Sequence, residues 1–238
     1  MADTYTWYIT GTSRGLGLEL VRQLVSSEYP YNFVIAACRN PSSATELNAL
    51  TPTKGNTLHV VQLDVCDEVS IQASASETEQ LLQDKGLDYL VNNAAVSGGT
   101  DTLSNLSIPW FKKTFDTNVL GPALVTRTFL HLVEKSQRKV VLNMSSGLGS
   151  IALDYGQEYA SYSPCKTALN MLTYKQAKAR PDLIFLTMCP GWCKTEMGGE
   201  GAEIEPSDSM AGAIRLLQNA TLEHSGRYWR YTGVELPW

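Results

Sequence analysis

Seven short apolar runs alternate with longer amphipathic segments along the chain. They are rich in β-branched and aromatic residues, and they read TWYIT (6–10), FVIAACR (33–39), LHVVQLD (58–64), LDYLVNNAA (87–95), KVVLNMSS (139–146), DLIFLTMCPG (182–191) and RYWRYTG (227–233). Continuous apolar strands separated by helices are typical of a parallel sheet that is buried on both faces. The pattern therefore predicts a doubly wound α/β fold, with a mostly parallel sheet flanked by helices.

Two of the intervening segments carry clear helix signals. Residues 67–84 begin with acids, which the helix macrodipole favours in a first turn, and they place apolar residues among polar ones. Residues 107–135 are expected to form one helix after a capped turn, because Pro109 is tolerated only near a helix start. No repeat or low-complexity tract divides the chain, so residues 1–238 are expected to form a single domain.

Charge and composition exclude several classes of protein. The formal net charge of −5 provides no basic surface for nucleic acid or an anionic membrane. No apolar run is long enough to cross a bilayer and no secretory signal is recognisable, so we expect a cytoplasmic protein. The cysteines form no C-x-x-C pair and the histidines lie far apart, which argues against disulfides and against a metal site.

A glycine turn, TGTSRGLG, follows the first apolar run. Gly11 is expected to make the tight turn, Gly15 to allow close approach of a pyrophosphate, and Gly17 to let the following helix pack on the strand. A three-glycine pattern alone also occurs in ordinary loops. Its position between the first strand and the first helix favours a dinucleotide site of the Rossmann type.

The charges near this turn indicate which dinucleotide binds. An NAD site normally has an acid at the end of the second strand for the ribose 2′-hydroxyl, and none occurs between residues 29 and 45. Arg39 stands there instead, and Arg14 lies within the glycine turn. Two guanidiniums beside a 2′-phosphate favour NADP(H), whereas the alternative is that both are solvated surface charges.

Six motifs in order along nearly the whole chain resemble the short-chain dehydrogenase/reductase family. They are TGTSRGLG, NNAA, TNVLGP, NMSS, YSPCK and PGWCKT. The ending YTGVELPW and the loop TEMGG are similar to the carbonyl-reductase branch that includes C-factor-like proteins. The resemblance implies that the chain is one dinucleotide-binding catalytic domain.

The resemblance makes Tyr162 the general acid/base and Lys166 its partner. Residues four apart share one helix face, so both side chains can reach one pocket. Lowering a tyrosine pKa from about 10 to about 7 needs about 4 kcal/mol, which a cation about 4 Å away provides at an effective dielectric of about 20. Tyr155 and Tyr159 compete for the role, but neither has a cation four residues later.

Ser146 and Asn118 complete the catalytic set that the resemblance implies. Ser146 would hydrogen-bond the substrate carbonyl, and its neighbour Ser145 is expected to be a structural cap. Ser146 precedes Tyr162 by 16 residues, more than the family's usual spacing, so the intervening loop is expected to be enlarged. Asn118 would hold water in a proton relay toward Lys166.

The resemblance also implies a set of cofactor-binding residues. The glycine turn contributes Ser13 and Leu16 besides Gly11, Arg14, Gly15 and Gly17, and Arg39 follows the second strand. The other positions are Asp64 and Val65 beside adenine, Asn93, Ala94 and Ala95 on the ribose side, Pro190, Gly191, Cys193 and Thr195 at the nicotinamide, and Tyr162 and Lys166 themselves. Cys193 replaces a usual aliphatic residue and Ala95 a more frequent glycine.

The expected function is NADPH-dependent reduction of a ketone or aldehyde. The pocket is expected to be bordered by Val96, Leu148, Tyr155, Trp192 and Met197, whose character suggests an apolar or aromatic carbonyl substrate. Residues 194–206 are a candidate lid or a surface loop. A cofactor-binding regulatory or signalling protein and an alcohol dehydrogenase working oxidatively are the alternatives. The resemblance leaves a homodimer, a homotetramer and a monomer open.

Overall fold

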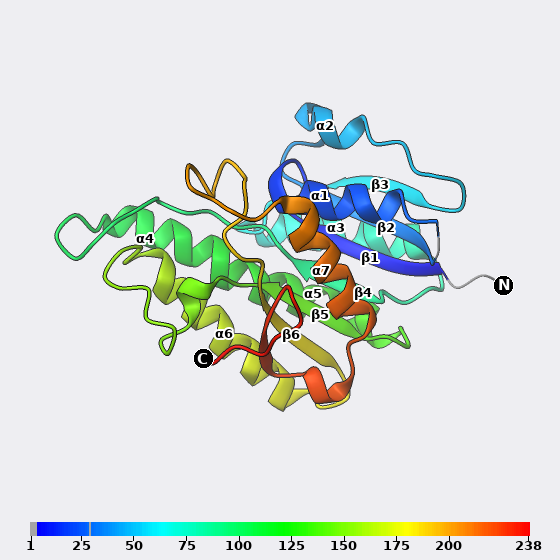
Figure 1. Ribbon diagram of the computed structural model, residues 1–238. Coiled ribbons are helices and arrows are strands. Elements are labelled where there is room, and N and C mark those ends of the chain that lie inside the picture. Colours follow the sequence, from blue (N-terminus) through cyan, green and yellow to red (C-terminus); the bar gives the residue numbers. More distant parts are fainter. Residues whose placement is uncertain (1–3, 29) are drawn as a thin grey trace.

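The computed structural model describes residues 4–28 and 30–238 (Figure 1). In these residues seven parallel strands form one sheet in the order β3-β2-β1-β4-β5-β6-β7. The strands are β1 (Thr4–Thr10), β2 (Tyr31–Cys38), β3 (Thr57–Gln62), β4 (Tyr89–Asn92), β5 (Val140–Met144), β6 (Ile184–Cys189) and β7 (Arg227–Arg230). Each of the seven predicted runs overlaps one strand.

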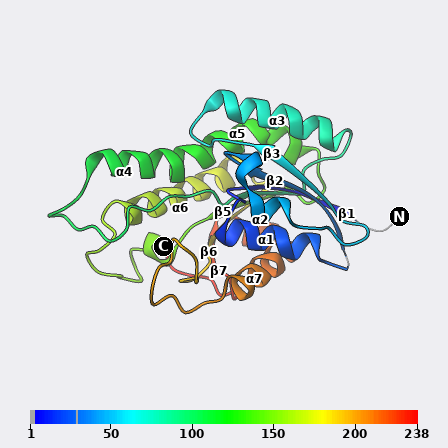
Figure 2. The same cartoon turned by 90° about the horizontal axis from the view of Figure 1, so that it is seen from above.

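Helices cover both faces of the sheet, as Figure 2 shows. They are α1 (Gly15–Val25), α2 (Thr45–Asn48), α3 (Glu68–Leu82), α4 (Ile108–Phe115), α5 (Gly121–Glu134), α6 (Tyr162–Ala179) and α7 (Pro206–Gln218). Successive strand residues point to opposite faces, so Trp7 packs in the layer of α1 and α7, and Tyr8 in that of α3, α5 and α6. The predicted doubly wound α/β fold is confirmed.

The two helices predicted from the sequence are present, and one of them contains a local irregularity. The Asp67 carboxylate accepts a hydrogen bond from the Val69 N–H and caps α3, as its acidic start predicted. Helices α4 and α5 follow one another through a π-helical turn, η2 (Asp116–Leu120). Pro122 has no N–H to donate, and the Gly121 N–H bonds to Asp116 five residues earlier, which widens the helix there.

The strand order places a topological switch point between β1 and β4. The chain runs outward from β1 to β3 on one side of the sheet and from β4 to β7 on the other. Ligands of such sheets bind outside the carboxyl ends of the strands at this point. Among the described residues, no helix is long and apolar enough to cross a membrane, and no three His, Cys, Asp or Glu side chains are grouped for a metal ion.

Candidate active site

The glycine turn between β1 and α1 requires its glycines for two reasons, positive φ angles and a lack of room for a Cβ atom. Gly11 and Gly15 have φ values of +72° and +60°, a region that side chains rarely adopt. A Cβ on Gly11 would lie 2.7 Å from the Cα of Ala94, and one on Gly17 would lie 2.3 Å from the Gly11 carbonyl oxygen. No side chain caps α1, because Arg14 at the N-cap makes no such bond. The turn therefore holds the positive end of a helix next to a close-packed backbone.

Thr10 and Asn93 hold the turn against the end of β4. The Thr10 hydroxyl accepts hydrogen bonds from the N–H groups of Asn93 and Ala94, at 3.0 and 2.9 Å. The Asn93 amide donates to the carbonyls of Thr10 and Gly11, at 2.9 and 3.1 Å. Sequence reasoning placed Asn93 beside the ribose and missed Thr10. A hydroxyl on the last residue of a buried strand was the available signal.

The two predicted phosphate-binding arginines begin at neighbouring strand ends. Arg39 follows β2 directly and is exposed, and Arg14 follows β1, which pairs with β2. Arg14 forms an ion pair of 3.0 Å with Glu196, a residue of the loop after β6, and both side chains are mostly exposed. Asp64 follows β3, and its carboxylate accepts from the Cys66 N–H at 2.9 Å. These side chains all start from the carboxyl edge of the sheet.

The Tyr162 and Lys166 side chains lie together at the start of α6. Tyr162 is the first residue of the helix, and the two are 8% and 2% exposed. The Lys166 Nζ lies 5.5 Å from the centre of the Tyr162 ring and donates to the Met144 carbonyl at 2.7 Å. Tyr159 has a φ of +59° in the preceding turn. The structure thus brings together the pair that spacing predicted.

Burial dominates the electrostatics of this pair. It lowers the pKa of Lys166 to about 8 from its ordinary 10.5. It also raises the pKa of Tyr162 well above 10, and the nearby Cys189 and Cys165 thiols act in the same direction. The expectation that one lysine suffices to lower the tyrosine pKa is wrong for the protein alone. Burial removes water from the Tyr162 phenolate, and this loss of hydration outweighs the favourable effect of the Lys166 ammonium. The ammonium lies 5.5 Å from the centre of the Tyr162 ring and 2.7 Å from the Met144 carbonyl oxygen, to which it donates.

Ser146 opens the loop that leads from β5 to α6, and residues 146–153 are called the serine loop below. That this loop is enlarged relative to the family stays a prediction. Ser146 is half-buried, and its hydroxyl accepts from the Leu148 N–H at 3.3 Å to start the short helix η3 (Gly147–Gly149). Ser145 is buried and donates to the Asn170 side chain at 2.6 Å. Capping, expected of Ser145, is therefore done by Ser146, because the Ser145 hydroxyl is occupied elsewhere.

Asn118 lies within the π-helical turn and is buried. Its amide oxygen accepts from the Val96 N–H at 2.9 Å, and its amide nitrogen donates to the Val96 carbonyl at 2.8 Å. Both polar ends of the side chain are thus used to fix the loop after β4. Pro122, four residues later, cannot donate to the Asn118 carbonyl. This positioning contact was not foreseen, because the two residues are far apart in sequence.

The segment after β6 returns to pair with itself. Gly191 has a φ of +80°, and the buried Cys193 forms a parallel bridge with Ile204. The Lys194 N–H bonds to the Ile204 carbonyl at 2.9 Å. The Thr195 hydroxyl accepts from the Gly198 N–H at 3.1 Å. Residues 194–206 are therefore mostly exposed and tied to one another at the base of the segment. Their role as a lid stays a prediction.

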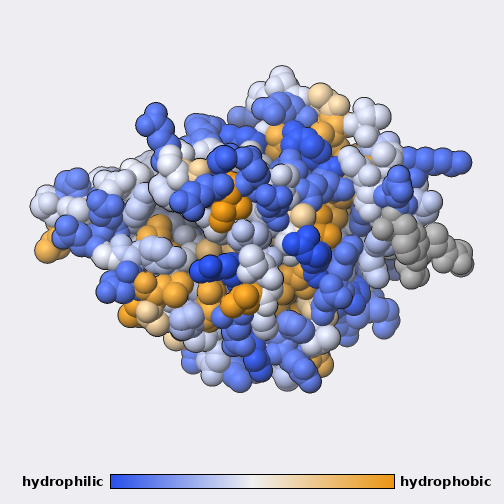
Figure 3. All heavy atoms as spheres, in the orientation of Figure 1, coloured by the Kyte–Doolittle hydropathy of each residue, from blue (hydrophilic) through white to orange (hydrophobic). Residues whose placement is uncertain are grey.

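The predicted substrate residues differ in exposure. Val96 and Leu148 are half-buried, whereas Tyr155, Trp192 and Met197 are about half exposed. A Cβ on Gly147 would lie 2.9 Å from the Tyr155 hydroxyl, so that ring lies over the serine loop. In Figure 3, apolar side chains gather around the end of the chain that Figure 1 marks C, on a mostly hydrophilic face.

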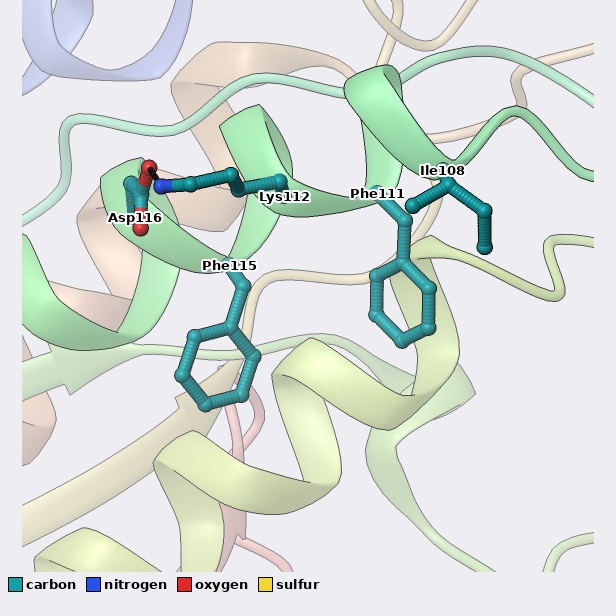
Figure 4. A pocket seen from close by; sticks show the side chains of 5 residues that line it. All are labelled: Ile108, Phe111, Lys112, Phe115 and Asp116. Carbon is teal, nitrogen blue, oxygen red and sulfur yellow. Dashed lines mark hydrogen bonds and ion pairs between the residues drawn. The ribbon is translucent and has the colours of Figure 1, made fainter.

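A separate groove lies along α4. The apolar side chains of Ile108, Phe111 and Phe115 line it, and Lys112 forms an ion pair of 2.6 Å with Asp116 at its rim (Figure 4). None of the residues predicted for the active site lines this groove.

Comparison with known proteins places this geometry in a family. The profile of the short chain dehydrogenase family matches residues 6–205. C-signal of Myxococcus xanthus is 34% identical over 64% of this chain and 93% of its own length. A short chain dehydrogenase of Penicillium aethiopicum is 30% identical over 98% of this chain and 99% of its own.

Solved structures agree with the sequence comparison. The NADPH-bound carbonyl reductase from chicken fatty liver is 31% identical, with a TM-score of 0.91 over 99% of this chain and 100% of that one. The carbonyl reductase Sniffer of Drosophila melanogaster is 27% identical, with a TM-score of 0.93 and the same coverage. The glycine turn, the Tyr162 and Lys166 pair and these matches agree: the chain belongs to the short-chain dehydrogenase family of oxidoreductases.

Proposed function

We propose that the protein is an NADPH-dependent carbonyl reductase. The observation that carries the proposal is the buried Tyr162 and Lys166 pair on α6. The Lys166 ammonium donates to the Met144 carbonyl at the carboxyl end of β5, two residues before Ser146. A neutral phenol is a proton donor, and burial keeps that of Tyr162 protonated. Reduction of a carbonyl needs such a donor at the substrate oxygen.

The residues at the edge of the sheet fit a dinucleotide with a 2′-phosphate. Gly11 and Gly15 provide a backbone with positive φ, and the uncapped start of α1 suits a pyrophosphate. Arg39 follows β2 where an NAD site would carry an acid, and Arg14 lies nearby in the glycine turn. The solved relative from chicken holds NADPH. When bound, the cofactor would supply the hydride.

The chain's own groups would act at the substrate oxygen. The Ser146 hydroxyl would donate a hydrogen bond to the carbonyl and stabilise the charge that develops there. Tyr162 would give its proton to that oxygen, and the Lys166 ammonium would stabilise the phenolate left behind. Asn118 would hold the loop after β4 through Val96. The partly exposed Tyr155, Trp192 and Met197 favour an apolar or aromatic ketone or aldehyde.

The proposal is tested by titrating the protein with NADPH and NADH, followed by turnover on aromatic and aliphatic ketones and quinones. We expect tighter binding of NADPH and NADPH-dependent reduction. The substitution Tyr162→Phe is expected to lower kcat by about 10² to 10⁴-fold with NADPH binding unchanged. Tyr159→Phe, three residues earlier, is the matched control and is expected to leave kcat unchanged. Equal rates for the two variants would refute the role of Tyr162.

The same assay separates the alternatives. The similarity to C-signal favours a signalling protein as the second candidate. NADPH binding without turnover on any carbonyl would support that candidate. Oxidation of alcohols with NADP⁺ at rates far above carbonyl reduction would support an alcohol dehydrogenase instead. Cytoplasmic location and a homodimeric or homotetrameric state stay predictions.

A further inference from the structure

The end of the chain turns back along β7. The Arg230 N–H bonds to the Val234 carbonyl at 2.7 Å, and the Leu236 N–H bonds to the Tyr228 carbonyl at 2.7 Å. Residues 234–238, called the C-terminal segment below, therefore run antiparallel to β7. They carry most of the motif YTGVELPW, to which the catalytic set assigns no role.

The C-terminal segment is bound to the serine loop by backbone and side-chain contacts. The Ser150 hydroxyl donates to the Pro237 carbonyl at 2.8 Å, and the Ala152 N–H donates to the Trp238 carbonyl at 3.1 Å. The Trp238 ring stacks on that of Tyr228, with 5.6 Å between ring centres and 15° between planes. The segment thus connects β7 to the loop that carries Ser146.

The Tyr228 side chain reaches the catalytic serine itself. It is 1% exposed, and its hydroxyl donates to the Ser146 carbonyl, which also accepts the Gly149 N–H at 2.8 Å. On the other side, the Gly149 carbonyl accepts from the side chains of Thr167 and Asn170, both at 3.0 Å and both on α6. The serine loop is therefore held between α6 and β7.

We infer that Tyr228 is a positioning residue for Ser146, and that the C-terminal segment holds it in place. The inference rests on the proposed reductase function. A hydroxyl that donates to a carbonyl has no second proton for substrate, so Tyr228 acts through the serine backbone. Fixing the Ser146 peptide fixes the direction of its hydroxyl toward the substrate oxygen, and such alignment governs rate. Burial raises the pKa of Tyr228, so it remains a donor across the working pH range.

The test compares Tyr228→Phe with two other variants. We expect kcat for a ketone to fall between about fivefold and about 100-fold, with the dissociation constant of NADPH unchanged. In the background of Ser146→Ala, the same substitution is expected to change kcat less than about twofold, because its effect passes through the serine. Tyr8→Phe is the matched control: it removes another buried hydroxyl, bonded to Ser74 at 2.6 Å, and should leave kcat unchanged.

Hydrogen exchange provides a readout independent of turnover. In Tyr228→Phe, the amides of the serine loop, including Gly149, are expected to exchange severalfold faster than in the wild-type protein, and Tyr8→Phe should leave them unaltered. Trp238→Ala should accelerate the same amides, because it removes the ring that packs on Tyr228.

Three results would overturn the inference. They are unchanged exchange in the serine loop, an unchanged kcat in an active enzyme, and an equal loss of kcat in the presence and absence of Ser146. A wild-type protein that binds NADPH and turns over nothing would refute the proposed function and, with it, the catalytic part of the inference. The exchange measurement would still decide whether Tyr228 orders the loop.

Discussion

Replacing Lys166 by methionine should make the protein more stable at neutral pH while removing its activity. Lys166 is 2% exposed, and burial lowers its pKa from 10.5 to about 8. At pH 7 the side chain is mostly protonated in both the folded and the unfolded state. The lowered pKa means that carrying this charge costs the folded state about 3 kcal/mol of stability relative to the unfolded chain. Methionine has a similar length and no charge, and removes this cost.

The net gain is smaller, because the lysine also makes a hydrogen bond. Its Nζ donates to the Met144 carbonyl at 2.7 Å, and leaving that carbonyl without this donor costs about 1 to 2 kcal/mol. The free energy of unfolding of Lys166→Met at pH 7 is therefore expected to exceed that of the wild-type protein by about 1 to 2 kcal/mol. Activity should be lost, since nothing then stabilises the Tyr162 phenolate.

The pH dependence of the stability difference shows whether the charge of Lys166 causes it. Between pH 8 and 10.5 the unfolded chain binds more protons at this position than the folded one, so wild-type stability rises with pH across that window. The stability advantage of Lys166→Met should shrink by about 2 to 3 kcal/mol between pH 7 and pH 10, and turn into a deficit. Urea denaturation at each pH measures both proteins, and the other titrating groups cancel in the difference.

Lys175→Met is the matched control, because Lys175 lies exposed on the same helix. It should change stability by less than about 0.5 kcal/mol, independently of pH. A stability difference between wild type and Lys166→Met that stays constant from pH 7 to pH 10 would contradict this prediction. Lys166 would then not be a buried cation with a lowered pKa.

Three further substitutions test other parts of the site. Gly17→Ala would bring a methyl group within 2.3 Å of a backbone oxygen of the glycine turn, and should lower the urea midpoint and weaken NADPH binding at least tenfold, measured by fluorescence titration. Glu196→Gln frees Arg14 from its ion pair and should tighten NADPH binding about two- to fivefold at low salt while NADH binding is unaffected; equal changes for both cofactors would contradict a 2′-phosphate contact. Asn118→Ala removes both hydrogen bonds to the Val96 backbone, and should lower the unfolding free energy by about 2 to 3 kcal/mol and remove most of kcat. Unaltered stability would show that the loop after β4 keeps its conformation without these bonds.

Much of the fold followed from local patterns. The seven apolar runs predicted the strands because a strand buried on both faces needs continuous apolar sequence over a few residues. Asp67 and Pro109 predicted helix starts because end effects act within one turn. The π-helical turn at Asn118 was not predicted, although Pro122 was visible. Whether a missing N–H bends a helix, breaks it or widens it depends on what packs around it.

In the candidate site, too, some features follow from local spacing and others depend on the folded structure. Spacing along one helix was enough to pair Tyr162 with Lys166, since residues four apart share a face whatever surrounds them. Burial of the pair, and with it the direction of both pKa shifts, depends on strands and loops that arrive from elsewhere in the chain. The expected lowering of the tyrosine pKa by the lysine was wrong for that reason.

Local patterns were enough to predict the succession of strands and helices along the chain, the glycine turn, the absence of an acid after the second strand and the tyrosine and lysine pair. The folded structure was needed to show that Asn118 binds Val96, that Arg14 pairs with Glu196, and that Tyr228 reaches Ser146, 82 positions earlier in the sequence. Local rules act over a few residues along the chain. The long-range contacts instead depend on the sheet order, which brings distant strand ends to one edge.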